Sequence, residues 1–419
     1  MKKIIALFLA YMMLFLTACN QTTSSETTSG LPNGSQSQEQ PKDSELKDKI
    51  IQNNTSDFMD IPSRILFEYP VSSNQFSTIY IFYYSKADGK AYVYCFDPLC
   101  DHTGGKCLAL PNNFSQNIFL KLRHMFFINN RFYGATMSGK IISFAFDGSD
   151  MKVEYDSGYG SGSFTNIWST NFRVYDKYIY IPMNADENGN PHILRFDTET
   201  KEMEDLTEKT GAYILPDFFY NGELYGRGKM PGDWYKADLS MENIEPIEEI
   251  LFSSQFYGSK FFSIAYDRSG TESKAIGIQS YDMKTGEINV FTNETLGLEE
   301  SQYTIVATDE KYIYFYPNKT ILVGTYMDAK GQERKLYKYN EGKLYRVKHD
   351  GTECVCIYDH PEFEFNSSSA VLCGNKIIID GHHVGIRDNM AVTWNAGMKS
   401  GTISPDGTIA KFEDVELIY

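Results

Sequence analysis

The chain has 419 residues and a formal net charge of −16, and its aromatic content of 15% includes 30 Tyr and 28 Phe. So acidic a chain repels a phosphate backbone, which argues against a nucleic-acid partner. Tyr and Phe suit half-buried strands, and no stretch beyond the N-terminus approaches the roughly 20 consecutive apolar residues that a membrane-spanning helix needs.

The first residues have the layout of a signal peptide. Lys2 and Lys3 form a positive region, and residues 4–16 form an apolar run that is too short to span a bilayer as a helix. Residues 16–19, with the letters LTAC, resemble the lipobox of bacterial lipoproteins. The resemblance implies that residues 1–18 are removed and that a diacylglycerol is attached to Cys19. The alternative is an ordinary secreted protein with a chance cysteine after Ala18.

The segment 19–55 predicts a lipidated cysteine followed by a disordered tether. From Asn20 to about Thr55 the chain consists mostly of Ser, Thr, Gln, Glu, Asn, Gly and Pro, with too few large apolar residues to bury a core. As a flexible coil of about 35 residues it would reach roughly 30 Å. We therefore expect residues 56–419 to fold as a separate domain, held at the outer face of the cell membrane.

Residues 56–419 contain a recurring unit of four strands. Aromatic second strands recur at intervals of roughly 40 to 65 residues, and turn pairs such as Asn129-Asn130 and Asn221-Gly222 precede most of them. This spacing predicts an all-β fold, a β-propeller of seven four-stranded blades. Six blades and a pair of β-sandwiches are the alternatives. The second strands begin near Thr78, Arg131, Lys177, Glu223, Lys260, Lys311 and Lys376.

Two segments resemble the repeats of known extracellular propellers. They are LYRVKHDGTECVCIYD, residues 344–359, and ISPDGTIAKF, residues 403–412. Both are similar to repeats of TolB-like and low-density-lipoprotein-receptor-like propellers. Each covers a single blade, so the resemblance implies an architecture and says little about activity. The cysteine pattern in residues 95–107 also resembles one found in uncharacterised surface lipoproteins of anaerobic Gram-positive bacteria.

The first blade contains a cluster of potential metal ligands. Cys95, Cys100, His102 and Cys107 have the spacing C-x4-C-x-H-x4-C. Three thiolates and one imidazole form a complete set for structural zinc, whereas exported proteins commonly form disulfides, so both interpretations stay open. Either role is structural, because a closed four-ligand site leaves no position for substrate. We expect no other cofactor.

The sequence holds no nucleophile elbow, Walker loop or HExxH helix, so no catalytic residue is assigned. Connections between second and third strands lie on one face of a propeller, and two of them are long, residues 317–335 and 381–401. A third connection of this kind, residues 226–234 with the letters GRGKMPGDW, is shorter. Together the last two segments carry the residues that we expect on a binding face: Arg227, Asp233, Trp234, His382, His383, Arg387, Asp388 and Trp394.

These features favour a binding role over catalysis. The preferred hypothesis is a membrane-tethered extracellular lipoprotein, a binding or scaffold protein that presents this loop face to a protein, peptide or glycan. One alternative is a surface polysaccharide hydrolase or lyase, whose carboxylates would come from several blades and meet only in space. Another is a structural member of an envelope complex.

Overall fold

The computed structural model describes part of the chain, all within the compact unit Gln38–Tyr419. The expected signal peptide, Cys19, His102 and Cys107 lie outside the described residues. The described residues are 50–51, 58–61, 64–73, 76–95, 99–100, 125–135, 140–146, 148–156, 172–183, 190–230, 232–247, 255–267, 269, 274–299, 302–395, 397–404, 408–409 and 411–418.

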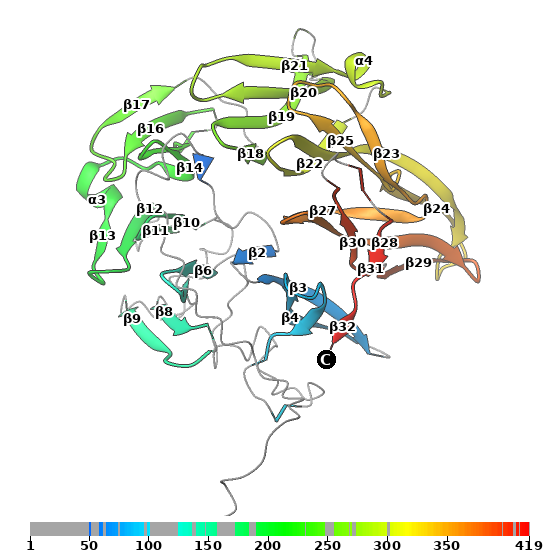
Figure 1. The fold of residues 1–419 in the computed structure, drawn as a ribbon, viewed down its shortest axis with the longest axis horizontal. Coiled ribbons are helices and arrows are strands. Elements are labelled where there is room, and N and C mark those ends of the chain that lie inside the picture. Colours follow the sequence, from blue (N-terminus) through cyan, green and yellow to red (C-terminus); the bar gives the residue numbers. More distant parts are fainter. Residues whose placement is uncertain are drawn as a thin grey trace, which may run out of the picture. The chain divides into compact units, whose positions relative to one another are not determined.

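The described strands form seven separate sheets, in which neighbouring strands pair antiparallel except for the C-terminal strand of the first blade, which pairs parallel. The sheets follow one another around a ring, so the fold is a seven-bladed β-propeller (Figure 1). The seven predicted second strands are all present as the second strands of their blades, which confirms seven blades and excludes six. In the described part the helices are two short turns, α3 (Leu206–Thr210) and α4 (Asn293–Leu296).

The first three blades run from the N-terminal side. Blade 1 contains β2 (Phe58–Ile61), β3 (Arg64–Ser73), β4 (Phe76–Ser85), β5 (Ala91–Val93) and the C-terminal β32 (Leu417–Ile418). Blade 2 contains β6 (Met125–Ile128), β7 (Arg131–Ala135), β8 (Lys140–Ala145) and β9 (Lys152–Asp156). Blade 3 contains β10 (Arg173–Tyr175), β11 (Tyr178–Met183), β12 (His192–Asp197) and β13 (Met203–Asp205).

Four further blades complete the ring. Blade 4 contains β1 (Ile50–Ile51), β14 (Leu215–Tyr220), β15 (Glu223–Arg227), β16 (Trp234–Asp238) and β17 (Ile244–Ile247). Blade 5 contains β18 (Gln255–Tyr257), β19 (Lys260–Asp267), β20 (Lys274–Asp282) and β21 (Ile288–Thr292). Blade 6 contains β22 (Gln302–Thr308), β23 (Tyr312–Met327), β24 (Glu333–Asn340), β25 (Lys343–Lys348) and β26 (Val355–Asp359). Blade 7 contains β27 (Phe363–Cys373), β28 (Lys376–Arg387), β29 (Met390–Asn395), β30 (Lys399–Thr402) and β31 (Glu413–Asp414).

Local turn chemistry explains where the first two strands of a blade meet. Asn129 and Asn130, which join β6 to β7, have φ angles of 50° and 59°, and Asn221 and Gly222, which join β14 to β15, have 52° and 78°. Two successive positive φ angles define the tight hairpin turn whose twist matches that of the strands, and Asn and Gly adopt it at little cost. The predicted turn pairs at these places are confirmed.

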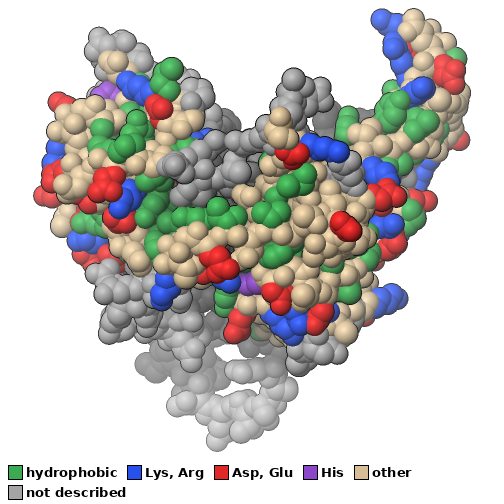
Figure 2. Space-filling model, turned by 90° about the horizontal axis from the view of Figure 1, so that it is seen from above, with side chains coloured by type: hydrophobic (Ala, Val, Ile, Leu, Met, Phe, Trp, Pro, Cys, Tyr) green, Lys and Arg blue, Asp and Glu red, His purple; other side chains and the backbone are tan. Residues whose placement is uncertain are grey.

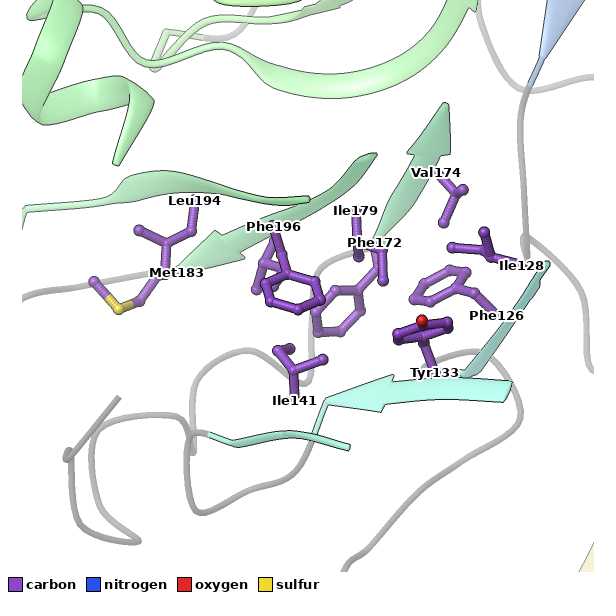
Figure 3. Packing of buried hydrophobic residues seen from close by; sticks show 11 residues of the cluster. Phe126, Ile128, Tyr133, Ile141, Phe172, Val174, Ile179, Met183, Leu194 and Phe196 are labelled. Atoms are coloured by element: carbon purple, nitrogen blue, oxygen red, sulfur yellow. The ribbon is translucent and has the colours of Figure 1, made fainter. Parts of the chain in front are cut away.

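The core lies between the blades. Seven apolar clusters each join two neighbouring sheets, and the cluster between blades 2 and 3 contains Phe126 and Tyr133 facing Phe172, Ile179 and Phe196 (Figure 3). A sheet that buries both faces in this way needs apolar side chains on both sides of its strands, as the first six residues of β23 show, which are all buried. The many aromatic side chains of this protein thus pack neighbouring sheets against each other.

The C-terminal end closes the ring. β32 pairs with β5 in a parallel register, Leu417 with Ala91, and the Lys90 ammonium lies 2.8 Å from the Glu416 carboxylate. Beside this contact, Cys373 and Ile378 of blade 7 share one apolar cluster with Phe82 and other residues of blade 1. Sequence-distant segments are therefore joined without a covalent bond among the described residues.

The N-terminal segment reaches the inner side of the ring. β14 is the first of the four repeat strands of blade 4, and β1 pairs with its inner edge. In blade 1, β2 pairs with β3 in the same way (Figure 1). Ile50 and Ile51 belong to the stretch expected to be a tether, so a paired strand begins a few residues before the expected boundary near Thr55. The rest of the expected tether lies outside the described residues.

Candidate functional site

The three connections singled out in the sequence lie on one face of the propeller. Each joins the second to the third strand of its blade, and such turns fall on the same side because successive antiparallel strands alternate in direction. The two long connections were expected to be loops. In the structure they are β-hairpins. β23 and β28 extend beyond their blades and pair with β24 and β29, since pairing satisfies backbone groups that a long loop would leave to water.

An open pocket of about 460 Å³ lies on this face beside blade 4. One side is formed by Tyr213 and Leu215, which lead into β14, together with Pro191 ahead of β12. The other side is the β15–β16 turn, with Arg227 at its start and Lys229 and Met230 beyond it. The pocket thus combines an aromatic and apolar wall with two cationic side chains.

The β15–β16 turn is held by its own backbone. The N–H of Gly228 donates to the carbonyl of Asp233 at 2.9 Å, and the N–H of Asp233 donates to the carbonyl of Met230. A Cβ atom on Gly228 would lie 2.7 Å from the Tyr235 ring, so a larger residue would displace the turn. Asp233 therefore supports the turn through its backbone.

Arg227 is aimed by a buried acidic residue. Its Nε and Nη2 donate to the two carboxylate oxygens of Asp217 at 2.7 and 3.1 Å, in the two-pronged geometry that suits a guanidinium and a carboxylate. The guanidinium also lies 5.9 Å from the centre of the Trp234 ring. Trp234 was expected on the binding face; it is 7% exposed, so most of its ring is buried, with Arg227 over the ring.

A second arginine shares the same carboxylate. Arg173, on the innermost strand of blade 3, is 1% exposed, and its Nη2 lies 3.8 Å from Asp217. Its Nε donates to the Asp217 carbonyl and its Nη1 to the Phe172 carbonyl. Burial lowers the pKa of Arg173 to about 10; the Asp217 carboxylate opposes that shift and Arg227 adds to it.

The charge balance of this group leaves the pocket rim cationic. Two guanidinium groups share the one carboxylate of Asp217, and Lys229 is exposed on the same rim. Burial also raises the pKa of Tyr213, so its hydroxyl stays protonated and can donate a hydrogen bond. Arg173 and Asp217 were not singled out in the sequence. An Arg opening one inner strand and an Asp within the next, LPDFFY, were the available signals.

The remaining predicted residues lie on blade 7, three blades further around the ring. The Nε2 of His382 lies 3.4 Å from the carboxylate of Glu364, and the Nδ1 of His383 lies 3.2 Å from the Glu362 carbonyl. Arg387 and Asp388 stand at the end of the hairpin, where Asp388 has a φ of 49°. The backbone of Trp394 pairs with His383. The structure thus divides the predicted face between a pocket on blade 4 and a hairpin on blade 7.

Half of the predicted cysteine cluster can be placed. Cys95 and Cys100 pack at the edge of the apolar cluster that joins blades 7 and 1, and that cluster contains a further cysteine, Cys373. Among the described residues no group of three or more His, Cys, Asp or Glu side chains is arranged to hold a metal ion. With His102 and Cys107 outside the described residues, zinc and disulfide both stay predictions.

No helix within the described part of the chain has the length and apolar character needed to cross a membrane. The fold and the pocket define the class of protein: a seven-bladed β-propeller with a cationic pocket on the face of its second-to-third strand connections.

No family model and no curated protein matches the chain. Among solved structures it is similar to an oligogalacturonate lyase from Vibrio parahaemolyticus, with 10% identity, a TM-score of 0.43, and coverage of 86% of this chain and 93% of that one. BamB from Moraxella catarrhalis is similar with 12% identity, a TM-score of 0.33, and coverage of 80% and 82%.

An oligogalacturonate lyase in complex with manganese is similar over 53% of this chain and 62% of that chain, with 12% identity and a TM-score of 0.31. At these TM-scores the similarities carry no argument about this chain.

Proposed function

We propose that this chain is a membrane-tethered extracellular lipoprotein that binds a ligand carrying carboxylate or other anionic groups on the loop face of its propeller. The observation that supports a binding role is the Arg227–Asp217–Arg173 group, which aims a guanidinium at the pocket beside Lys229 and Tyr213. An arginine held in advance by a bidentate partner loses little freedom when a ligand binds.

The chemistry of the pocket favours an acidic sugar or an acidic peptide end. Tyr213, Leu215 and Pro191 offer an apolar wall on which a sugar ring or side chain can lie, and Arg227 and Lys229 offer charge-assisted hydrogen bonds. On a chain with a net charge of −16, a local pair of exposed cations selects for anions against the general field.

The test is a titration of the purified full-length protein with glucuronate, with glucose as the neutral control. We expect saturable glucuronate binding that weakens about tenfold or more in Arg227→Met and Lys229→Met, because each variant removes a charge-assisted hydrogen bond. Lys152→Met is the matched control, since Lys152 is an exposed lysine on blade 2. Equal binding of glucose, or equal loss in the control, would contradict the proposal.

The enzyme alternative is tested on the same preparation. Acidic oligosaccharides and chromogenic glycosides are incubated with the protein, and turnover that is lost in Arg227→Met would replace the binding proposal with a hydrolase or lyase. The anchor is tested by Cys19→Ser, which removes the thiol that a lipid would modify. Metabolic labelling with a fatty acid should then be lost, and the protein should leave the membrane fraction.

A further inference from the structure

Blades 6 and 7 carry an arm that has no counterpart in the described part of the other blades. It consists of residues 318–340, the outer part of β23 with β24, and residues 382–395, the outer part of β28 with β29. In Figure 1 these strands lie outside the ring on the right, and in Figure 2 the corresponding part projects from the right-hand side of the body.

The inner faces of the two hairpins are packed against each other and against β27. A Cβ atom on Gly324 would lie 2.8 Å from the Ile386 side chain, so the hairpins touch closely there. At their ends the N–H of Met327 donates to the carbonyl of Asn389. The arm therefore has a defined inner face.

Two polar contacts hold the base of the arm. The ammonium of Lys338, which is 5% exposed, donates to the Pro361 carbonyl, and the N–H of Tyr339 donates to the Glu364 carboxylate at 3.0 Å. Because alternate residues of a strand point to opposite faces, a buried Lys338 requires Tyr337 and Tyr339 to point outward. The attachment of the arm thus decides what it exposes.

The outer face is apolar where a solvent-facing surface is ordinarily polar. Tyr339 is 66% exposed, Tyr337 41%, Leu322 51% and Met327 41%. Leu322 pairs with Tyr337 across the two strands, so both side chains lie on the same face. Lys335, two residues from Tyr337, continues the row and is exposed. Tyr339, Tyr337 and Lys335, at every second position of one strand, thus form an exposed strip.

The arm hairpin is also positively charged. Residues 318–340 contain five Lys or Arg and two Asp or Glu, a net charge of +3, in a chain whose net charge is −16. Lys319 is paired with Glu299 and Glu341, and Lys338 is buried. The remaining exposed cations of the hairpin are Lys330, Arg334 and Lys335. The charge of this segment is opposite to that of the rest of the chain. An anionic partner would therefore be attracted to the arm and repelled from most of the remaining surface.

We propose that the outer face of the arm binds an extended anionic polysaccharide, with sugar rings lying on Tyr337, Tyr339 and Leu322 and the acidic groups near Lys335. The tyrosine rings offer an apolar surface with a polar tip at low entropic cost, which suits a ligand with both apolar faces and hydroxyl groups. The proposal extends the proposed function by naming the class of ligand.

Two other occupants fit the geometry less well. Insertion into a membrane would lead with the hairpin end, but that end carries Asp328, Lys330 and Gln332, while the apolar side chains lie along the flank. A second copy of the chain would bring two bodies of net charge −16 together, which their mutual repulsion opposes. A linear, negatively charged polymer along the strip meets neither difficulty.

The experiment compares the affinity of the full-length protein for alginate, an acidic polysaccharide, with that for dextran, a neutral one. The variant is Tyr337→Ser with Tyr339→Ser, and the matched control is Ile288→Ser with Val290→Ser, since those side chains are 62% and 45% exposed on the outer strand of blade 5. We expect alginate affinity to fall about tenfold or more in the arm variant and to stay unchanged in the control. Melting temperatures should match in all three proteins.

A charge variant makes the test specific. Lys335→Glu should weaken alginate binding and its dependence on salt, because it reverses a charge in the row. Unchanged alginate affinity in the arm variant overturns the inference. So does binding to anionic phospholipid vesicles that the arm variant abolishes, or self-association seen by sedimentation that the arm variant abolishes.

The pocket and the arm can fail separately. Arg227→Met should lose glucuronate binding and keep the arm contribution to alginate affinity, whereas the arm variant should keep glucuronate binding. Alginate binding through the arm without glucuronate binding by the pocket would refute the proposed pocket ligand and leave the arm assignment standing.

Discussion

The pocket on blade 4 and the arm on blades 6 and 7 present cations on the same face of the ring, but they hold them differently. At the pocket, Arg227 is gripped by Asp217, which also serves the buried Arg173. On the arm, Lys335 and the tyrosines stand on a face with no covering element among the described residues, and the buried polar contacts lie behind it. At the pocket, a buried ion group fixes the position of the cation that meets the proposed ligand. On the arm, the residues that meet the proposed ligand are exposed, and the polar contacts that hold the strand lie behind them.

The largest effect is expected from the buried charge group. Asp217→Asn removes the carboxylate shared by Arg173 and Arg227 and leaves a guanidinium buried without a counter-charge, so the free energy of unfolding should fall by about 3 kcal/mol or more. Guanidinium-induced unfolding measures it. Asp233→Asn, in the adjacent turn, is the control and should change stability by less than about 0.5 kcal/mol. Equal effects would mean that the shared carboxylate contributes no special stability.

The base of the arm should respond to acid. Burial by itself would raise the pKa of Glu364, but the hydrogen bond from His382, the Tyr339 N–H and the charge of Lys338 hold it below its usual value of 4.5. A carboxyl group with a lowered pKa stabilises the folded arm above about pH 4.5, and that stabilisation is lost as the pH falls through the lowered pKa. We expect a local loss of about 1–2 kcal/mol.

Hydrogen exchange of peptides from β24, corrected for the intrinsic effect of pH, measures this loss, and peptides from β6, a strand of blade 2 without acidic residues, serve as the internal reference. Glu364→Gln should exchange faster at neutral pH and lose the response to acid. If β6 responds as strongly as β24, acid acts on the whole ring, and the response is not a local property of the arm.

The arm and the apolar cluster that joins blades 7 and 1, which we call the seam, both involve blade 7. A substitution in the seam tests whether the two features are independent. Cys373 is 6% exposed within the seam cluster, and Cys373→Ser places a hydroxyl among apolar groups, at a cost of about 1–2 kcal/mol. Exchange should rise in β5 and β30 but not in β24. Faster exchange in β24 would show that the arm depends on the seam.

Metal analysis and thiol counting accompany this variant. One zinc per chain that is lost in Cys100→Ser and released by chelators would establish the predicted metal site. A metal-free protein with a crosslink that responds to reductant would establish a disulfide.

The smallest effect is expected at the inner edge of blade 4. Deleting residues 20–51 removes β1 and its pairing with β14, and should cost about 1 kcal/mol, the value of one or two backbone hydrogen bonds. Deleting residues 20–45 leaves β1 in place and should cost nothing measurable. The melting temperatures of the two truncated proteins, compared with that of the full chain, report the difference. A loss in both would mean that earlier residues also contribute.

Local patterns predicted most of the architecture. The aromatic second strands and the Asn-Gly type turns are short-range signals, since a turn with positive φ angles and a strand rich in Tyr and Ile are each encoded within a few residues. The blade count and the shared face of Arg227 and His382 followed from these signals. The hairpins of the arm were expected to be loops, because Gly and polar residues in long connections obscure the alternation of side chains that marks a strand. That alternation is present in Leu322 to Met327 and in Leu336 to Tyr339.

The sequence by itself determined the repeat and the face on which the connections fall, because these depend on neighbours in the chain; it favoured seven blades over six, and the structure shows seven. Tertiary structure alone decided that Trp234 is buried, that Asp217 serves both Arg173 and Arg227, that Cys373 joins Cys95 and Cys100 at the seam, and that Tyr337 and Tyr339 point outward. Each of those facts depends on residues from different strands or blades meeting in space, and burial and partnership at such meetings leave no periodic signal in the chain.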